Sequence, residues 1–363
     1  MKLQVTQENL AKALNTVARV ASGRSTLPIL SNVLLKTVGT RLSIAATNLD
    51  IAINCLVGSK ISEEGSITVP ARLMQDFVSS LPNGVIDLEL TDNKLNITTD
   101  KYQSVINGTA AEDFPIMPAI TGGNKWKLPA KVLKEGLQQV VVACSNDEAR
   151  PVLTGVYFHT EDGKLQIVAT DSYRLAERTL IKTDDKIDLL IPGSAMQDLL
   201  RILSDYEEDV EVTNDDQQVL FKVGDIELVT RLIEGKYPDY KKLIPAKFAT
   251  SATLKRSDFL NISKVSSLFA RESAGSIKIE VSEGKKQVSI RSVASQLGEN
   301  TASADCKASG EDDITLNSRY LIDGLNALNE DEVTFGFNGK LEPCVIKASK
   351  GQDYTHVIMP LKS

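Results

Sequence analysis

The sequence predicts an α+β protein of three similar domains, each with two helices packed on antiparallel sheets. Three observations favour this class: a helical pattern recurs six times, short segments of two-residue alternation lie between the helices, and a second signal has twice the helical period. The chain has 363 residues, more than one hydrophobic core usually supports, so several domains are expected.

The helical pattern is an apolar residue, a residue typical of a helix start, and then an amphipathic stretch. Six copies in 363 residues give a repeat of about 60 residues. Proline suits a first helical position, because its missing N–H would have no partner there. The start residues are Thr6, Pro70, Pro129, Pro192, Ser257 and Asn317, and we expect helices within residues 4–17, 68–81, 127–140, 190–203, 253–268 and 315–328.

The segments between the helices alternate apolar and polar residues and end at Gly, Asn or Asp, as strands and their turns do. Each repeat is therefore expected to hold one helix and about three or four antiparallel strands. The clearest predicted strands are RLSIAAT (41–47), IDLELTD (86–92), KLNITTD (94–100), KLQIVAT (164–170), DVEVTND (209–215), IKIEVSE (277–283) and KQVSIRS (286–292).

A signal of double period ends successive blocks: Phe114-Pro115, Tyr237-Pro238 and Met359-Pro360 follow one another at about 120 residues. Two repeats therefore make one domain. Residues 119–125 and 245–252 are small, polar and rich in Gly, Pro or Ser, which is typical of linkers. The predicted domains are residues 1–124, 125–248 and 249–363.

Composition excludes several classes of protein. Apolar residues make up 42% and charged residues 25%, as in an ordinary globular protein. The sequence has neither the apolar run of a signal peptide nor a segment long enough to cross a membrane, so a cytoplasmic protein is expected. The four cysteines are scattered and there are only two histidines, so buried free thiols are a better interpretation than disulfides or a metal site.

No motif indicates an enzyme or a cofactor. The chain contains no GxxxxGK[ST] loop, GxSxG elbow, HExxH or GxGxxG pattern. His159 is expected on a strand surface, and the carboxylate pairs Asp184-Asp185, Asp215-Asp216 and Asp312-Asp313 are expected in turns between strands.

The net charge of −7 taken alone argues against a nucleic-acid partner. In the six helical segments and their ends, however, basic residues outnumber acidic ones, so the negative charge belongs to strands and loops. Helices on one common face would attract phosphates weakly and without sequence preference, although such residues are more often just a solvated helix side. The candidate DNA-binding residues are Arg24, Arg72, Lys131, Lys134, Arg150, Arg201 and Lys264.

Several segments in order resemble the bacterial DNA polymerase III beta sliding clamp family, and the resemblance runs from end to end. The segments are GRSTLPIL (23–30), TVPAR (68–72), DFP (113–115), ATDSYRLA (169–176), KYPDYKKLIP (236–245), YLIDGLNAL (320–328) and HVIMPLKS (356–363). The resemblance implies a head-to-tail homodimer that closes into a ring, with helices lining the pore and sheets outside. Its partners would be duplex DNA, the replicative polymerase, a separate ATP-driven clamp loader, translesion polymerases and mismatch-repair proteins.

The resemblance also implies particular residues. Leu268 and Phe269 would lie at the dimer interface. For DNA contact Arg24 matches the family well, whereas the 146–152 loop (NDEARPV) is acidic and lacks polar and aromatic residues that some relatives use there; within that loop Arg150 is the candidate. Tyr173 stands where the family commonly has His, and Lys242 where Arg is frequent, so the peptide preference is open at that end. The peptide-binding groove would consist of Leu153, Thr170, Ser172, Tyr173, Arg174, Leu175, Pro238, Lys242, Leu243, Asn317, Tyr320, Cys344, Val357, Met359 and Pro360.

In this groove the apolar residues would form a hydrophobic pocket, while Arg174 and Lys242 would supply donors to a peptide. Two other functions stay open at this point. One is a peptide-binding repeat protein that never contacts nucleic acid, and the other is an enzyme whose site carries no familiar motif.

Overall fold

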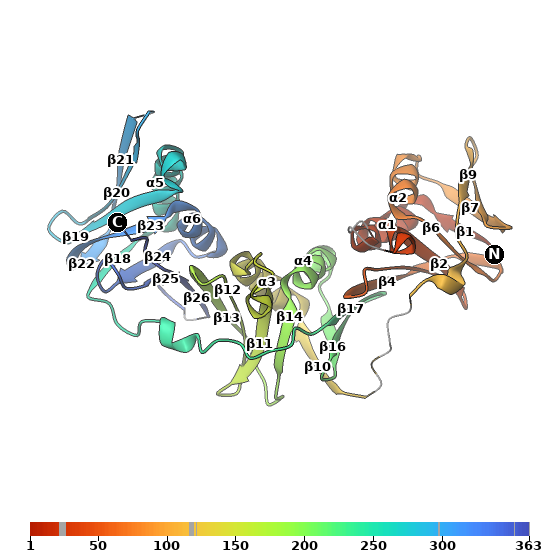
Figure 1. Ribbon diagram of the computed structural model, residues 1–363, viewed down its shortest axis with the longest axis horizontal. Coiled ribbons are helices and arrows are strands. Elements are labelled where there is room, and N and C mark those ends of the chain that lie inside the picture. Colours follow the sequence, from red (N-terminus) through yellow and green to blue (C-terminus); the bar gives the residue numbers. More distant parts are fainter. Residues whose placement is uncertain (22–26, 116–119, 121, 297, 352, 363) are drawn as a thin grey trace. The chain divides into compact units, whose positions relative to one another are not determined.

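The computed structural model describes residues 1–21, 27–115, 120, 122–296, 298–351 and 353–362. Its elements follow a sixfold repeat of one strand, one helix and three further strands (Figure 1). Two short strands, β5 (Lys60–Glu63) and β22 (Lys307–Ser309), are additional to this pattern. The predicted repeat of one helix with three or four strands is therefore confirmed.

The six predicted helices are all present. Pro70, Pro129 and Pro192 do not occupy the first helical position, however, because each is the last residue of a strand directly before its helix. The fixed φ of proline suits this extended position equally well. Asn317 caps its helix by accepting a hydrogen bond from Arg319 N. The helices are α1 (Gln7–Ala21), α2 (Ala71–Ser80), α3 (Ala130–Val140), α4 (Gly193–Ile202), α5 (Arg256–Phe269) and α6 (Ser318–Ala327); Ser257 lies inside α5.

The first of two compact units comprises Met1–Lys131 and Gln197–Leu232. It contains a five-stranded sheet of order β5-β1-β7-β8-β9 and an eight-stranded sheet of order β10-β15-β16-β17-β4-β3-β2-β6. Helix α1 packs on α2 and on β3 and β4. The strands are β1 (Lys2–Thr6), β2 (Asn32–Val38), β3 (Arg41–Thr47), β4 (Ile51–Gly58), β6 (Ser66–Pro70), β7 (Val85–Thr91), β8 (Lys94–Thr98), β9 (Gln103–Asn107), β10 (Asn124–Pro129), β15 (Asp209–Asn214), β16 (Gln218–Val223) and β17 (Ile226–Arg231).

The second compact unit comprises Val132–Met196 and Ile233–Ser363. It contains a nine-stranded sheet of order β14-β11-β12-β13-β26-β25-β24-β18-β22 and a four-stranded sheet of order β21-β20-β19-β23. Helix α5 packs on α6 and on β20 and β21. The strands are β11 (Gly155–Glu161), β12 (Lys164–Thr170), β13 (Arg174–Lys182), β14 (Asp188–Pro192), β18 (Thr250–Lys255), β19 (Ser276–Ser282), β20 (Gln287–Ala294), β21 (Gly298–Asp305), β23 (Glu311–Asn317), β24 (Glu332–Phe337), β25 (Cys344–Ala348) and β26 (Tyr354–Ile358).

The strand pairing follows one rule throughout. The first strand of each repeat pairs in the sheet of the neighbouring repeat, as β1 does with β7 and β6 does with β2. The last strand of a repeat joins the last strand of another: β4 pairs with β17 and β13 with β26, all antiparallel. The eight-stranded sheet therefore combines strands of repeats one to four, and the nine-stranded sheet combines strands of repeats three to six.

Two expectations about polar residues are corrected. Asp312 and Asp313 do not lie in a turn, because they belong to β23 and pair with Val281 and Glu280 of β19. His159 is on a strand as expected, but its ring stacks on Tyr157 and is half-buried, so it is not a simple surface residue.

All four cysteines are free, and none of the described residues form a cluster of His, Cys, Asp or Glu that could hold a metal ion. Among the helices of the described ranges, none is both long and apolar enough to span a membrane.

Candidate functional site

Two of the segments predicted to form the groove are neighbouring strands of the nine-stranded sheet. β13 and β26 pair antiparallel, with Arg174 opposite Ile358 and Leu175 opposite Val357. Beyond the end of β26, Met359 N donates a hydrogen bond to Tyr173 O at 2.8 Å. The segments ATDSYRLA and HVIMPL, far apart in the sequence, therefore lie side by side.

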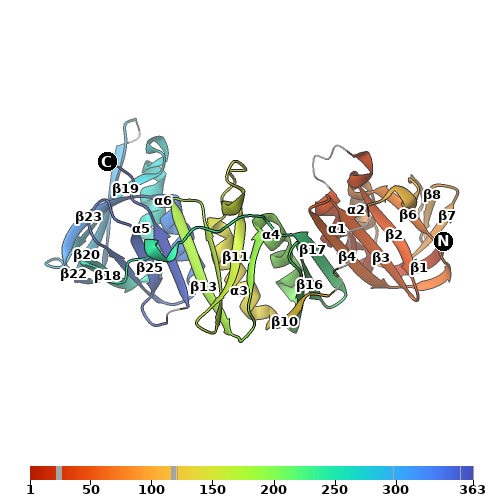
Figure 2. The ribbon, with the colours of Figure 1, turned by 60° about the horizontal axis from the view of Figure 1, so that its bottom comes forward.

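The third predicted segment crosses the same sheet. We call residues 233–249 the strap; Figure 2 shows it running as an extended trace across β11 and β13. Its Tyr237 and Tyr240 are buried in one apolar cluster with Leu175 and Val357, and with Val168, Leu190 and Val345. The sheet and the strap are thus held together by apolar packing.

The strap presents other side chains to solvent. Pro238 and Lys242 are exposed and Leu243 is 44% exposed. Lys242 Nζ forms an ion pair with Asp239 at 2.7 Å, which raises the pKa of Lys242. Apolar and basic groups are therefore available along this edge of the cluster.

Arg174 has a different environment from the one predicted. Its side chain is 8% exposed, and it pairs with Asp171 at 3.1 Å and with Asp323 at 2.5 Å. The guanidinium also lies 4.5 Å from the ring centroid of Tyr320, in a cation–π contact. These contacts engage Nε and Nη1 within the protein and fix the guanidinium beside Tyr320.

The turn before β13 separates buried from exposed members of the predicted site. Thr170 is buried and its hydroxyl donates to Arg174 O at 2.6 Å, while Ser172 adopts a positive φ of 77°. This tight turn leaves Tyr173 58% exposed. Leu153 and Cys344 are buried, so in the predicted groove they would lie beneath the surface residues. Met359 and Pro360 are half-buried and therefore partly accessible. Burial raises the pKa of the Cys344 thiol, which is therefore neutral.

Asn317 and Tyr320 come from the N-terminal end of α6. Asn317 Nδ2 donates to Ala274 O at 3.2 Å, and Tyr320 faces Arg174. Leu361 N donates to Thr315 O at 2.8 Å, which ties the C-terminal segment to β23 just before Asn317. Tyr320 contacts the predicted groove through Arg174. Asn317 is linked to the groove through β23, which ends at this residue, and through its role as the cap of α6.

The residues that attach the strap to the sheet were not predicted from the sequence. They are chiefly Tyr237 and Tyr240, which are buried in the apolar cluster, and Lys241, which pairs with Glu161 and Glu177. The pattern KYPDYKKL carried a usable signal, because two tyrosines three residues apart in a polar linker are unlike ordinary linker composition. Their partners Val168, Leu190 and Val345 were not separable from general core residues.

The candidate DNA-binding residues are dispersed over both units. Lys131 on α3 and Lys264 on α5 are exposed, and Arg72 on α2 is 90% exposed beside Asp76. Lys134 on α3 is half-buried. Arg24 lies outside the described residues.

Arg150 lies in a tight turn, within the loop expected at residues 146–152. Its backbone N–H donates to Asp147 O at 3.1 Å, and Nε pairs with the Asp147 carboxylate at 2.9 Å. Nη1 donates to Ser172 Oγ at 2.9 Å. The turn therefore places Arg150 beside Ser172 of the predicted peptide site.

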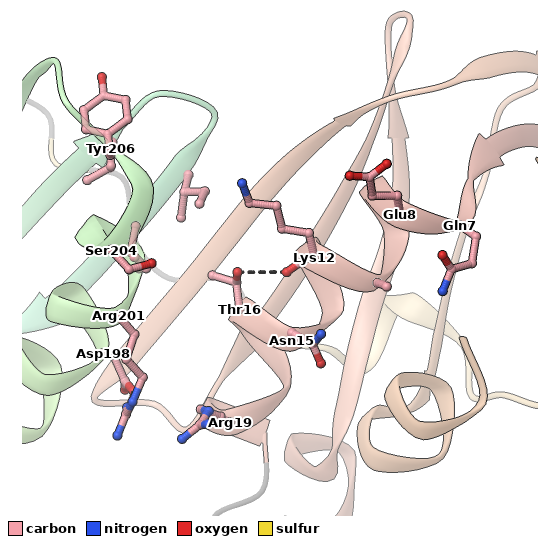
Figure 3. Close-up of a pocket in the computed structure, with 14 residues that line it drawn as sticks. Gln7, Glu8, Lys12, Asn15, Thr16, Arg19, Asp198, Arg201, Ser204 and Tyr206 are labelled. Carbon is pink, nitrogen blue, oxygen red and sulfur yellow. Dashed lines mark hydrogen bonds and ion pairs between the residues drawn. The ribbon is translucent and has the colours of Figure 1, made fainter. Parts of the chain in front are cut away.

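In the first unit, α1 and the end of α4 border a pocket of about 660 Å³ (Figure 3). Lys12 and Arg19 come from α1, while Asp198 and Arg201 come from α4 and pair at 2.5 Å. Burial of Asp198 raises the pKa of its carboxyl. The ion pair with Asp198 offsets the charge of the predicted residue Arg201. Lys12 and Arg19 are further positive groups that line the same pocket.

Comparison with known proteins gives matches along the whole chain. Three family models match in order: the N-terminal, central and C-terminal domains of the DNA polymerase III beta subunit, at residues 1–118, 127–239 and 241–362. Beta sliding clamps of Staphylococcus epidermidis and Staphylococcus aureus are each 30% identical over 376 residues, with all of this chain and all of each relative covered.

Solved structures agree with the sequence matches. A DNA polymerase sliding clamp from Bacillus subtilis aligns with a TM-score of 0.94 and 28% identity, covering 100% of this chain and 99% of its own. A DNA polymerase III beta chain from Streptococcus pneumoniae gives 0.93 and 30%, and a sliding clamp from Pseudomonas aeruginosa bound to griselimycin gives 0.94 and 26%; both cover 100% of each chain. The chain has the three-domain clamp fold and belongs to the DNA polymerase III beta subunit family, the beta sliding clamps.

Proposed function

We propose that two copies of this chain close head to tail into a ring around duplex DNA and tether the replicative polymerase to it. The observation that carries this proposal is the pairing rule of the sheets. Four of the six last strands are joined in pairs, β4 with β17 and β13 with β26. The two that remain, β9 and β21, are edge strands in the described part of the chain.

An exposed edge strand presents unpaired N–H and C=O groups and is a template for pairing with another chain. If β9 of one copy pairs with β21 of the next, every junction in the assembly has the same antiparallel form. Two chains of three domains then make a closed ring of six domains, a count that comes from the family. Head-to-tail contacts of this kind generate rings when the rotation closes.

Apolar side chains near both edges support this contact. Val105 of β9 is 58% exposed, and Leu268 of α5 is 51% exposed. Since α5 packs on β21, Leu268 lies close to the edge that would meet β9. Phe269 is half-buried, so only part of its ring is available to a partner.

The proposed DNA contact is electrostatic and involves the helices. Lys131 and Lys264 are exposed on α3 and α5, and few such contacts give weak binding that depends on salt and not on sequence. Weak contacts permit sliding, so we infer that retention on DNA comes from ring closure. Sliding clamps are non-catalytic processivity factors, and we infer that a separate loader opens this one. Because a bacterial chromosome lies in the cytoplasm, we propose that the protein acts there.

The proposed peptide site lies between the second and third domains, whose boundaries we propose near residues 124 and 248. The exposed or half-buried groups Tyr173, Leu243, Met359 and Pro360 would receive the apolar anchors of a short linear motif. A related clamp from Pseudomonas aeruginosa has been solved with griselimycin bound. We propose that polymerases and repair proteins bind this chain through such a motif.

Processive synthesis tests the proposed function. A bacterial replicative polymerase and clamp loader extend a primed circular template, and the length of product made per binding event is measured with and without this protein. A large increase that requires the loader is the expected result. Peptide binding without any effect on synthesis would instead favour a peptide-binding repeat protein that does not act on DNA.

A further inference from the structure

The strap is held by two buried tyrosines three residues apart. Tyr237 and Tyr240 are 7% and 4% exposed, whereas Pro238 and Leu243 point outward between and after them. Residues Lys241–Leu243 form a short 3-10 helix, in which Leu243 N donates to Tyr240 O at 2.9 Å. The positions of Lys242 and Leu243 in this turn therefore depend directly on where Tyr240 is fixed.

Apolar packing alone does not fix Tyr240. Its hydroxyl donates to Glu177 Oε1 of β13 at 2.6 Å and lies 2.8 Å from His159 Nε2 of β11. The hydroxyl has one proton, which it gives to the carboxylate, so His159 Nε2–H is the donor to the Tyr240 oxygen. A single phenol thus connects the strap to two strands of the sheet.

The surrounding groups restrict both partners. His159 stacks on Tyr157 with ring centroids 4.8 Å apart, and the same Tyr157 ring stacks on Tyr237 at 4.8 Å. Burial lowers the pKa of His159, so its ring is neutral near pH 7. Lys241 Nζ contacts Glu177 at 2.8 Å, with Glu161 and Gln166 as further partners.

We propose that Tyr240 is a positioning residue: through His159 and Glu177 it holds the strap where Pro238, Lys242 and Leu243 meet a bound peptide, and so sets peptide affinity without touching the peptide. This inference rests on the proposed peptide site. It differs from a purely structural role because the hydroxyl is dispensable for filling the core, which the ring alone achieves.

Tyr240→Phe tests the proposal, because it removes the hydroxyl and keeps the ring. The matched control is Tyr157→Phe, which removes a phenol of the same stack that is bonded to Asp188 and not to the strap. Calorimetry with a peptide of the Gln-Leu-x-Leu-Phe type is expected to show roughly tenfold weaker binding to Tyr240→Phe, the scale of a lost charged hydrogen bond. The control should bind within about twofold of the unchanged protein, because no strap contact is lost.

Amide hydrogen exchange distinguishes a local loosening of the strap from a loss of stability of the whole unit. Faster exchange is expected at Leu243 and Ile244, whose N–H groups donate to Tyr240 O and Lys241 O, with little change in the strands. If Tyr240→Phe does not fold, His159→Phe replaces it, since a phenyl ring can still stack on Tyr157 but cannot donate to Tyr240.

The outcomes separate the two levels of inference. Equal peptide affinity for Tyr240→Phe and the unchanged protein overturns the positioning role but leaves the peptide site intact. Equal loss in Tyr240→Phe and Tyr157→Phe also overturns it, because the effect then follows general stability. No binding to the unchanged protein overturns the peptide site itself and the positioning role with it.

Discussion

A charge at Leu268 should open the ring. The side chain is 51% exposed in the single chain, and Leu268→Asp would place a carboxylate at the contact between β21 and β9 of the next copy. Burying the exposed half of a leucine contributes about 1 kcal/mol. Desolvating a carboxylate without a partner adds at least about 2 kcal/mol.

The loss is therefore about 3 kcal/mol per contact, and a two-chain ring has two such contacts, so the dimer weakens by about 6 kcal/mol. This corresponds to roughly a 10⁴-fold rise in the dissociation constant. Light scattering should report folded monomers at micromolar concentration, with an unchanged circular dichroism spectrum. A charge at Phe269 is a poorer test, because that ring is half-buried in its own unit.

Val38→Asp is the matched control, because Val38 is 49% exposed at the end of β2, which is not one of the two edge strands proposed to join. It should remain dimeric. A Leu268→Asp protein that is still dimeric at micromolar concentration would refute the proposed contact, and so would dissociation of both variants to the same extent.

Three further predictions concern the peptide site, the DNA contact and pH. Deletion of residues 359–363 should abolish peptide capture in calorimetry and leave the dimer intact, because half-buried Met359 and Pro360 belong to the site and not to the proposed contact; unchanged affinity would place the site elsewhere. Removing the positive charges of Arg24, Lys131 and Lys264 together should weaken loading on DNA and reduce the dependence of loading on salt concentration. Reversing the charge of Lys278 or Lys347, which lie on strands, should leave loading unchanged. Equal effects of the two sets of changes would contradict DNA contact through the helices. Burial lowers the pKa of His356 from 6.5 to about 3, so the unfolded chain binds more protons between these values and stability is lost as pH falls below 6.5. Relative to His356→Gln, the free energy of unfolding should fall by about 2 kcal/mol between pH 6.5 and 5, and parallel pH curves in denaturant titrations would refute a buried neutral ring.

The helices, the repeat and the clearest strands were predictable from sequence because their signals are local. The amphipathic stretches and two-residue alternation lie within single segments, and the Asn317 cap needs only its own helix. The pairing of strands was not predictable, because β1 joins β7 and β13 joins β26 across long separations that no local pattern records. Three domains therefore appear in the sequence, whereas the packing forms two compact units.

The candidate site shows the same division. The family resemblance identified its segments, and the pairing of β13 with β26 brings two of them together. It did not identify the partners of each side chain. Arg174 was expected to donate to a peptide because its segment matches the family, and the resemblance did not reveal that Asp171 and Asp323 pair with it inside the protein. Tyr240 was overlooked since its partners His159 and Glu177 are remote in sequence.

The most direct test of a closed ring is release by a cut in the DNA. The protein is loaded on a nicked circular duplex and washed in about 1 M salt, where the Debye length is about 3 Å and phosphate contacts are largely screened. A closed ring should stay on the circle and leave promptly once a restriction enzyme linearises it. Loss from the intact circle in salt, or retention on the linear product, would contradict a closed ring.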